Sequence, residues 1–571
     1  MELVPFSSSS NFHELSVPCE QLPVHTLVSI TQKELTRLKW EGSYWKAQHQ
    51  RACAREALLK KELEEKEAQI CDLKQRLFGK KSEKAKSAEK QATSEATRSR
   101  GQQRGRHGHG RTQRPDLPVV TEQIELPPDS CRCSNCGLPF APFPGDEEST
   151  VIEIEVRAYK RKYIRKRYKK VCSCPETPKI IVAPLPPKPI PKCSIAVSVW
   201  VEILLVKYLY AQPLHRTLRQ LTGFGQLVAQ GTVTGGLQKL LPLFLPLYHA
   251  LYEHQMGESL FHADESRWMV FVKTLGKIGH RWYLWLFRSR HVIYYRIEPT
   301  RSAAIPIDHF SNLVGDKIIL VVDRFSSYKK LSRVLAKMAT PKQIVLAFCW
   351  AHERRDFIEL ARDYPQFKDW AQNWIYEIGT LYHLNKQRLV HWEEILPLEG
   401  QNALFQEQHA LLEKQLLQMK ERCDSLLQTN QASQNEPDQT VTFPVELHTA
   451  QQKVLSSLKN HWKGLIVFLT HPEVPMDNNL GEQAIRNPVC GRKNYYGSGS
   501  DWSAKLTAVL FSLFQTLSLW NINTRHWLQQ YLLACAHNDG AAPKDLTPFL
   551  PWSMSEERRQ ELSKPLPMDT S

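Results

Sequence analysis

The feature that most constrains the fold is an apolar run that ends in an acid. Residues 318–322 read Ile-Ile-Leu-Val-Val, and Asp323 follows them directly. Apolar residues without polar alternation, rich in β-branched types, are typical of a strand buried on both faces of a sheet. The run therefore predicts a buried strand that delivers a carboxylate at its C-terminal end.

Further strand-like runs surround this one. The segment that carries Asp264 leads into a first strand, and a helical stretch precedes the run before Asp323. By residue number, the strands are expected at 268–272, 281–288, 292–297 and 344–348, and the helix at 303–313. Three antiparallel-type strands, a helix, a strand, a helix and a last strand form the order of a ribonuclease H-like α/β fold. That fold would place Asp264 and Asp323 at adjacent positions on the sheet.

A third carboxylate is expected on a later helix. Asp477 or Asn478 can cap that helix, and Glu482 shares one face with Arg486 at i, i+4. Three acids from distant parts of the chain suit two Mg²⁺ ions, because hard oxygen ligands hold the metals while substrate phosphates complete their shells. The candidates to neutralise phosphate charge nearby are Arg486, Arg492 and Lys493. The alternative is that these acids are strand-end and helix-surface residues without a catalytic role.

The net charge of +16 is concentrated in two segments. Residues 79–114 hold eleven Lys or Arg against three Glu, and residues 157–170 hold nine Lys or Arg and no acid. Together they carry +17, so the rest of the chain is close to neutral. This distribution indicates a polyanionic partner that is held at defined places. Residues 79–114 also lack large apolar side chains, which predicts a disordered DNA-binding arm or, alternatively, a solubilising linker.

The N-terminal region has the pattern of one long charged helix at residues 33–77. Five apolar residues fall on the a and d positions of a heptad repeat, and Lys66 interrupts them: Leu59, Leu63, Ile70, Leu73 and Leu77. This pattern fits two alternatives equally well: a short coiled coil for self-association, or a helix that packs on its own domain.

Two close cysteine pairs predict a zinc site. Cys133 and Cys136 are followed by Cys172 and Cys174, and four thiolates can hold one structural Zn²⁺ in a tetrahedron, as in a zinc ribbon. Cys131 is an alternative ligand for this zinc. The alternative to a zinc site is that these cysteines are reduced thiols without a common metal. Basic residues alternate with tyrosines between the pairs and are candidates for phosphate contacts: Arg161, Lys162, Arg165, Lys166 and Arg167.

Residues 197–240 read as three short helices, at 197–210, 214–223 and 231–240. They fit a helix-turn-helix-like DNA-binding region and a small structural subdomain equally well. No charge-free apolar run is long enough to span a membrane, and no secretory signal opens the chain. Thirteen cysteines, an odd number, favour reduced or metal-bound thiols over disulfides. The expected location is the cytoplasm, in association with the nucleoid, with no membrane partner.

At several motifs the chain resembles transposases of the insertion-sequence 66 family of bacterial mobile elements. The similar segments, in chain order, are 77–84 (LFGKKSEK), the cysteine pairs, Lys207-Tyr208, 212–216 (QPLHR), 262–266 (HADES), 349–357 (CWAHERRDF), 477–479 (DNN), 492–494 (RKN) and 550–552 (LPW). Departures include the narrow spacing of Cys172 and Cys174 and the Gln483 that follows Glu482.

The resemblance implies a DDE transposase in which Asp264, Asp323 and Glu482 hold two Mg²⁺ ions and perform catalysis. It implies double-stranded DNA partners (the ends of the element and target DNA), a homo-oligomer on DNA, and helper proteins encoded by the element. Arg354 and Arg355 are further candidates for DNA contact, and His352 has a structural or a catalytic role. Glu265, beside Asp264, is expected to support the site or to lie at the surface, because neighbours on a strand point to opposite faces.

The resulting domain order has an N-terminal helical or coiled-coil region, a basic linker, a zinc-binding domain, a helical DNA-binding region, a ribonuclease H-like core and a tail. The corresponding boundaries are 1–78, 79–118, 119–192, 193–245, 246–540 (with a helical insertion at 358–471) and 541–571. Two rival hypotheses accompany the transposase. One is a catalytically inactive DNA-binding protein or repressor derived from a transposase, and the other is a stand-alone nuclease with the same core.

Overall fold

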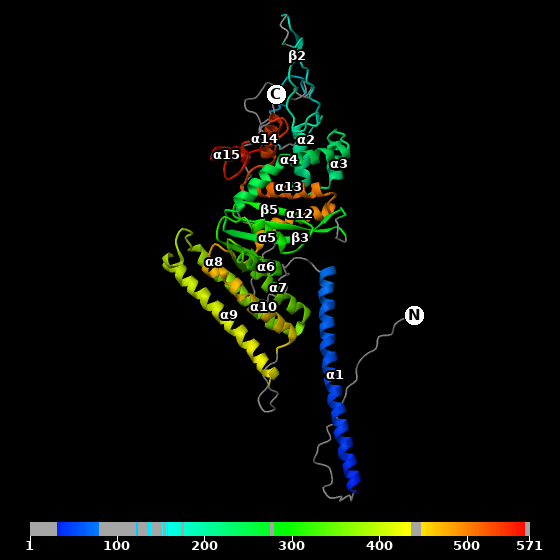
Figure 1. Ribbon diagram of the computed structural model, residues 1–571, viewed down its shortest axis with the longest axis vertical. Helices are drawn as coiled ribbons and strands as arrows, with labels where there is room; N and C mark the ends of the chain where they lie inside the picture. The colour runs from blue at the N-terminus through cyan, green and yellow to red at the C-terminus, as the bar shows by residue number, and fades with distance from the viewer. Residues whose placement is uncertain are drawn as a thin grey trace, which may run out of the picture. The chain divides into compact units, whose positions relative to one another are not determined.

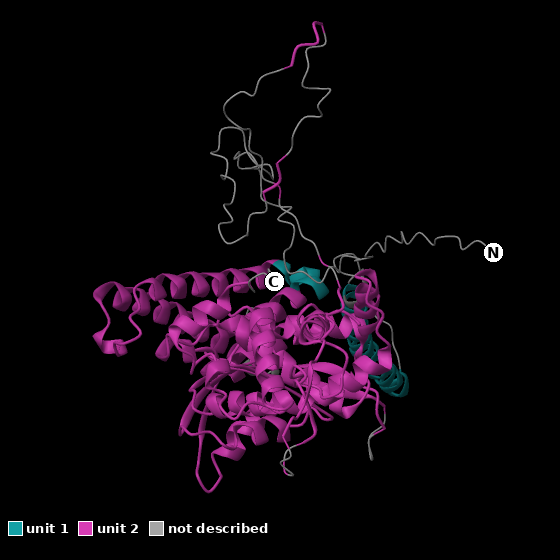
Figure 2. Cartoon of the chain, turned by 90° about the horizontal axis from the view of Figure 1, so that it is seen from above, with its two compact units in different colours: residues 1–84, 361–368 teal, residues 85–360, 369–571 magenta. Residues whose placement is uncertain are grey.

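The computed structural model of the chain describes residues 31–78, 121–123, 135–139, 151, 156, 158–172, 176, 178–273, 279–435 and 447–565. The predicted basic arm, Cys133 and Cys174 lie outside the described residues. The chain divides into two compact units, residues 1–84 with 361–368, and residues 85–360 with 369–571 (Figure 2).

The first unit consists mainly of one long helix, α1 (Gln32–Phe78). The predicted helix at 33–77 is therefore confirmed. All five heptad side chains are exposed, from 51% for Ile70 to 72% for Leu77. The leucine stripe is thus not covered by its own unit, and a coiled-coil partner stays a prediction.

A six-stranded mixed sheet lies at the centre of the second unit (Figure 1). Along the sheet the strands run β5, β4, β3, β6, β7, and the short β8 pairs with β3. Strand β4 is antiparallel to both of its neighbours, β3 and β5, whereas β6 and β7 run parallel to β3. Their bounds are β3 (Leu260–Val270), β4 (Arg281–Arg288), β5 (Ile293–Glu298), β6 (Lys317–Val322), β7 (Gln343–Phe348) and β8 (Gly497–Ser498). The predicted strand order is confirmed, and β3 starts early enough to include Asp264.

One edge strand of this sheet, β5, is covered by helices. Helix α13 (Asp501–Leu519) lies on β5 and packs against α4 (Gln230–Gln255), as Figure 1 shows. Hydroxyl groups of α13 accept hydrogen bonds from backbone N–H groups of the edge strand β5. The Ile293 N–H donates to Thr516 Oγ1 at 3.0 Å, and the Tyr295 N–H donates to Ser512 Oγ at 2.8 Å. A covered edge strand cannot template further pairing.

Further helices of the second unit follow the strands along the chain. Their bounds are α5 (Ala304–Phe310), α6 (Ser326–Leu335), α12 (Asn479–Tyr495), α14 (Thr524–His537), η6 (Thr547–Phe549) and α15 (Glu556–Ser563). Helix α6 packs on β7, and α12 packs on β3 and β4.

The segment before the sheet corrects one prediction. It contains β1 (Arg167–Lys169), β2 (Ile180–Val182), α2 (Val197–Leu204), the π-helical η3 (Leu205–Leu209), α3 (Leu214–Gly223) and α4. The expected third helix, 231–240, is too short, because α4 continues through Pro242 and Pro246 to Gln255. One apolar face of α4 is buried from Val233 to Leu251, on both sides of the prolines, and this packing outweighs the two lost hydrogen bonds.

The stretch between Asp323 and Glu482 is largely helical. It contains α7 (Trp350–Asp363), η4 (Pro365–Phe367), α8 (Lys368–Val390), η5 (Leu398–Gly400), α9 (Ala403–Asn435), α10 (Thr449–Leu465) and α11 (Val467–Thr470). The abundance of Gln and Asn at residues 428–439 predicts a loop there, and this prediction is wrong in part, because α9 extends to Asn435. Within the described ranges, none of the helices combines the length and apolar character of a bilayer-spanning segment.

Candidate active site

One pocket of about 450 Å³ gathers all three predicted acids. Asp264 reaches it from β3, Asp323 from the end of β6, and Glu482 from α12. We call it the acid pocket, and its remaining lining residues are His352, Arg355, Asn478, Ile485, Arg486, Val489, Cys490 and Lys493.

The register of the sheet brings the first two acids together. In the parallel pair β3–β6, His262 lies opposite Val321, an offset of 59 residues. The same offset separates Asp264 from Asp323, the first residue after β6, so the register brings the two acids to the same part of the sheet. Strands in this arrangement are about 4.8 Å apart, and directly paired residues of parallel strands point to the same face.

Asn478 fixes the position of Glu482 relative to β3. This buried side chain donates from Nδ2 to the Ala263 carbonyl oxygen at 2.9 Å, and its Oδ1 lies 2.9 Å from His262 Nδ1. Because Oδ1 can only accept, His262 carries its proton on Nδ1. Glu482 lies one helical turn after Asn478 and donates its backbone N–H to the Asn478 carbonyl. The start of α12 is thereby tied to β3 beside Asp264.

The surroundings of Asp264 disfavour its charged form. Burial, followed by the charge of Glu265 and smaller contributions from Asp323 and Glu482, raises its pKa to about 7. A hydrogen bond from the Glu265 backbone N–H to Oδ1, at 2.8 Å, opposes this shift. Excess negative charge in a half-buried pocket is an environment that a cation stabilises.

The residues around the acids fit divalent cations. Three carboxylates supply the hard oxygen ligands that Mg²⁺ prefers. Among the described residues, only His254, Glu258 and His291 have three ligand atoms within 4.8 Å of one another. The ligand atoms of the three acids in the pocket therefore do not all lie within 4.8 Å of one another.

One family accounts for most of the second unit. A sequence model of the transposase IS66 family matches residues 192–506, more than half of the chain. The chain belongs to this family. Family membership places it among the transposases, enzymes that act on DNA and generally use divalent metal ions.

The relatives found by sequence are themselves uncharacterised proteins of Sinorhizobium fredii. The protein y4hP is 22% identical over 446 residues, which cover 76% of this chain and 75% of the relative. The protein y4qI is 25% identical over 315 residues, covering 53% of this chain and 52% of the relative. The protein y4jD is 22% identical over 454 residues, with coverage of 77% and 81%. No solved structure matches the chain.

The basic candidates of this transposase fall into two groups. Arg355, Arg486 and Lys493 line the acid pocket, whereas Arg354 and Arg492 are not among its lining residues. The Arg492 guanidinium donates to Ser266 Oγ at 2.8 Å and to the Arg267 carbonyl at 2.5 Å. In this arrangement Arg492 joins α12 to β3.

His352 and Glu265 occupy different surroundings. His352 lines the acid pocket from the first turn of α7, its Nδ1 is buried without a hydrogen-bond partner, and burial lowers its pKa. Glu265 is not a surface acid, because its side chain is only 2% exposed. It pairs with Arg301 and accepts a hydrogen bond from the Tyr328 hydroxyl at 2.9 Å. Glu265 therefore supports the strand segment that carries Asp264.

The predicted zinc region is described only in part. Cys136 and Cys172 are exposed, whereas the other two predicted ligands lie outside the described residues. The strands β1 and β2 pair antiparallel. The five basic candidates of this region are all exposed: Arg161, Lys162, Arg165, Lys166 and Arg167.

Sequence reasoning missed the residues that hold the acids in place. Asn478 is a helix cap by position, but its side chain bonds to β3 rather than to its own helix. Cys349 accepts the Asn478 backbone N–H at 3.2 Å, and it immediately follows β7. Gly481 is a further signal, because a Cβ there would lie 2.8 Å from Asn478 Oδ1.

Proposed function

We propose that the chain is a DDE transposase that binds the ends of its element and catalyses metal-dependent DNA cleavage and strand transfer. The proposal rests chiefly on the convergence of Asp264, Asp323 and Glu482 on one pocket. The strand order and the 59-residue register support a ribonuclease H-like core. Convergence with pocket-lining basic residues favours catalysis over the inactive, binding-only alternative.

In the proposed site each side chain has a defined part. The three carboxylates would hold two Mg²⁺ ions, which when bound activate the attacking hydroxyl and stabilise the leaving oxygen. Arg355, Arg486 and Lys493 would neutralise the phosphates of the DNA backbone at the pocket.

Two further proposals concern the remainder of the transposase. The exposed basic residues of β1 and its flanks, together with residues 79–114, would bind the element ends, with one structural Zn²⁺ on Cys133, Cys136, Cys172 and Cys174. The exposed leucine stripe of α1 would mediate self-association on DNA. The domain boundaries predicted from the sequence remain proposals. Helper proteins and target DNA are proposed as further partners, and association with the nucleoid is proposed as well.

The catalytic proposal is tested with labelled DNA that carries the element ends, purified full-length protein and Mg²⁺. Asp264→Asn should abolish cleaved and joined products while DNA binding persists. Asp316→Asn is the matched control, because Asp316 precedes β6 at the opposite end from Asp323 and its side chain is 93% exposed. An unchanged product yield in Asp264→Asn would contradict the assignment. Cleavage without joining by the wild-type chain would favour the stand-alone nuclease.

A further inference from the structure

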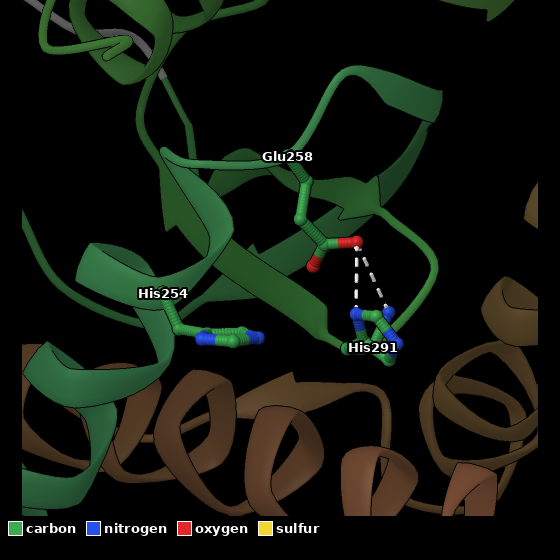
Figure 3. A group of neighbouring side chains, drawn as sticks. All are labelled: His254, Glu258 and His291. Carbon is green, nitrogen blue, oxygen red and sulfur yellow. Dashed lines mark hydrogen bonds and ion pairs between the residues drawn. The ribbon is translucent and has the colours of Figure 1, made fainter. Parts of the chain in front are cut away.

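Three potential metal ligands meet outside the acid pocket. His254 lies in the last turn of α4, Glu258 follows four residues later, and His291 lies in the turn between β4 and β5 (Figure 3). Their ligand atoms all lie within 4.8 Å of one another, and His291 Nδ1 is 3.5 Å from Glu258 Oε2. None of the three lines the acid pocket.

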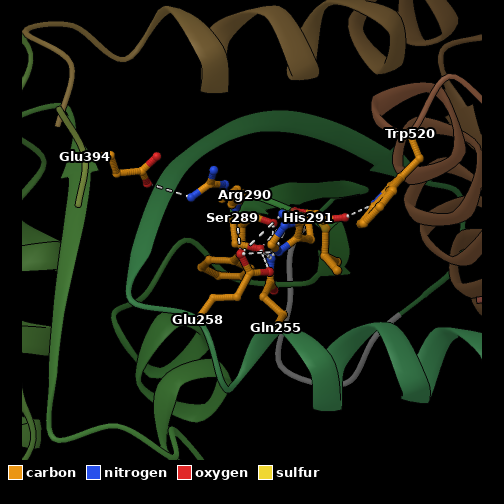
Figure 4. A network of polar contacts seen from close by, with 9 residues as sticks. Gln255, Glu258, Ser289, Arg290, His291, Glu394 and Trp520 are labelled. Atoms are coloured by element: carbon orange, nitrogen blue, oxygen red, sulfur yellow. Dashed lines mark hydrogen bonds and ion pairs between the residues drawn. The ribbon is translucent and has the colours of Figure 1, made fainter. Parts of the chain in front are cut away.

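The hairpin turn holds the carboxylate of this cluster in a fixed orientation. Glu258 Oε1 accepts from Ser289 Oγ at 2.7 Å, and Oε2 accepts from the backbone N–H groups of Arg290 at 2.9 Å and His291 at 3.3 Å (Figure 4). Gln255 Nε2 in turn donates to Ser289 Oγ at 3.2 Å. Supporting hydrogen bonds of this kind orient metal ligands in proteins.

The cluster retains unused ligand capacity. A carboxylate offers about four lone-pair positions, and the turn occupies three of those on Glu258. His254 Nε2 is buried and has no hydrogen-bond partner. A buried ring nitrogen without a partner costs free energy, and coordination of a cation would satisfy it.

We propose that His254, Glu258 and His291 form a further metal site of the zinc type, separate from the acid pocket and from the predicted cysteine site. Two imidazoles and one carboxylate are a donor set typical of Zn²⁺, and the partly exposed His291 leaves room for a water as fourth ligand. Zinc–nitrogen bonds of about 2.0–2.1 Å place tetrahedral ligand atoms about 3.3 Å apart, so binding would need only a small movement of ligand atoms that all lie within 4.8 Å of one another.

The position of the site indicates its role. Zn²⁺ there would join the end of α4 to the β4–β5 turn. Two tryptophans of the C-terminal region flank the ligands: Trp552 stacks on His254 with ring centres 4.1 Å apart, and Trp520 donates from Nε1 to the His291 carbonyl at 2.9 Å. The metal would therefore also order the surface on which the segment around Trp552 packs. This proposal is independent of the catalytic one.

Zinc content of the full chain tests the proposal. The variants are Glu258→Gln and His291→Ala, with Glu253→Gln and His249→Ala as matched controls on exposed positions of α4. Each site variant should lose about one zinc per chain relative to wild type, while both controls keep it. The same zinc content in all five proteins would overturn the proposal.

Cobalt substitution separates this site from the predicted cysteine site and also covers variants that fail to fold. In a folded Cys133→Ser, Cys136→Ser background, Co²⁺ should give visible absorption bands without thiolate charge transfer. Addition of Zn²⁺ should abolish these bands and raise the melting temperature of that protein. Binding of Co²⁺ and Zn²⁺ that Glu258→Gln leaves unchanged in that background would refute the metal site, because the acid pocket would then account for the bound metal, and the cluster would be a hydrogen-bonded cap of the hairpin.

Discussion

Replacement of Asn478 by alanine should damage both the stability and the activity of this transposase. Asn478 is 2% exposed, and its amide makes two hydrogen bonds to β3, one with the His262 ring and one with the Ala263 carbonyl. Alanine removes both bonds and leaves two buried polar groups without a partner. It also frees the first turn of α12, which carries Glu482.

The expected size follows from these contacts. An orphaned buried polar group costs about 1–3 kcal/mol, so the two together should lower the free energy of unfolding by about 2–4 kcal/mol after some relaxation. This loss is a large fraction of the stability of a typical domain, about 5–15 kcal/mol. A displacement of Glu482 by about 1 Å would reduce the cleavage rate by about 100-fold.

Urea unfolding and the element-end cleavage assay measure the two effects. Asn479→Ala is the matched control, because this neighbour is exposed and its side chain makes no hydrogen bond to the described residues of β3. A double-mutant cycle with His262→Ala should give a coupling energy of about 1 kcal/mol or more. The reasoning is refuted if Asn478→Ala unfolds at the same urea concentration as Asn479→Ala and cleaves at the wild-type rate.

Three further substitutions have outcomes fixed by the structure. Gly481→Ala should reproduce part of the Asn478→Ala defect in urea unfolding, because its Cβ would lie 2.8 Å from Asn478 Oδ1. Burial lowers the pKa of Lys207 to about 8, so the unfolded chain binds more protons above that pH and stability should rise with pH. Lys207→Met should remove about 1 kcal/mol of that gain between pH 7 and 9, measured by urea unfolding at both values. Arg388→Met should cost about 2–4 kcal/mol in the same assay, because the buried guanidinium donates to the Phe468 and Leu469 carbonyls at 2.8 and 3.1 Å.

The sheet could be predicted because its strands carry strong local signals. The apolar run before Asp323 and the aromatic run at 281–288 are both typical of buried strands. The order of these strands along the chain restricts the possible sheet topologies. The predicted helix at 231–240 is shorter than α4, because local rules treat Pro242 as a helix end, whereas burial of the apolar face on both sides of the prolines keeps the helix intact.

The three acids could be selected from the sequence, but the contacts that position them could not. Asp264 and Asp323 follow from the strand pattern, and Glu482 from its helix and the family resemblance. The bond from Asn478 to His262 joins residues 216 apart, and no local pattern encodes such a contact. The same holds for the cluster of His254, Glu258 and His291, because His291 reaches its partners only through the β4–β5 hairpin.

The charge distribution links the two ends of the proposed mechanism. The net positive charge lies in two N-terminal segments, while the acid pocket places three carboxylates where a phosphate would have to enter. The three positive charges of Arg355, Arg486 and Lys493 only balance the three carboxylates. Without further cations, the electrostatic free energy gained when a phosphate enters the pocket is therefore small. Bound Mg²⁺ would reverse this balance. The N-terminal segments would then hold DNA with or without Mg²⁺, whereas the pocket would accept the scissile phosphate only after the metals had bound.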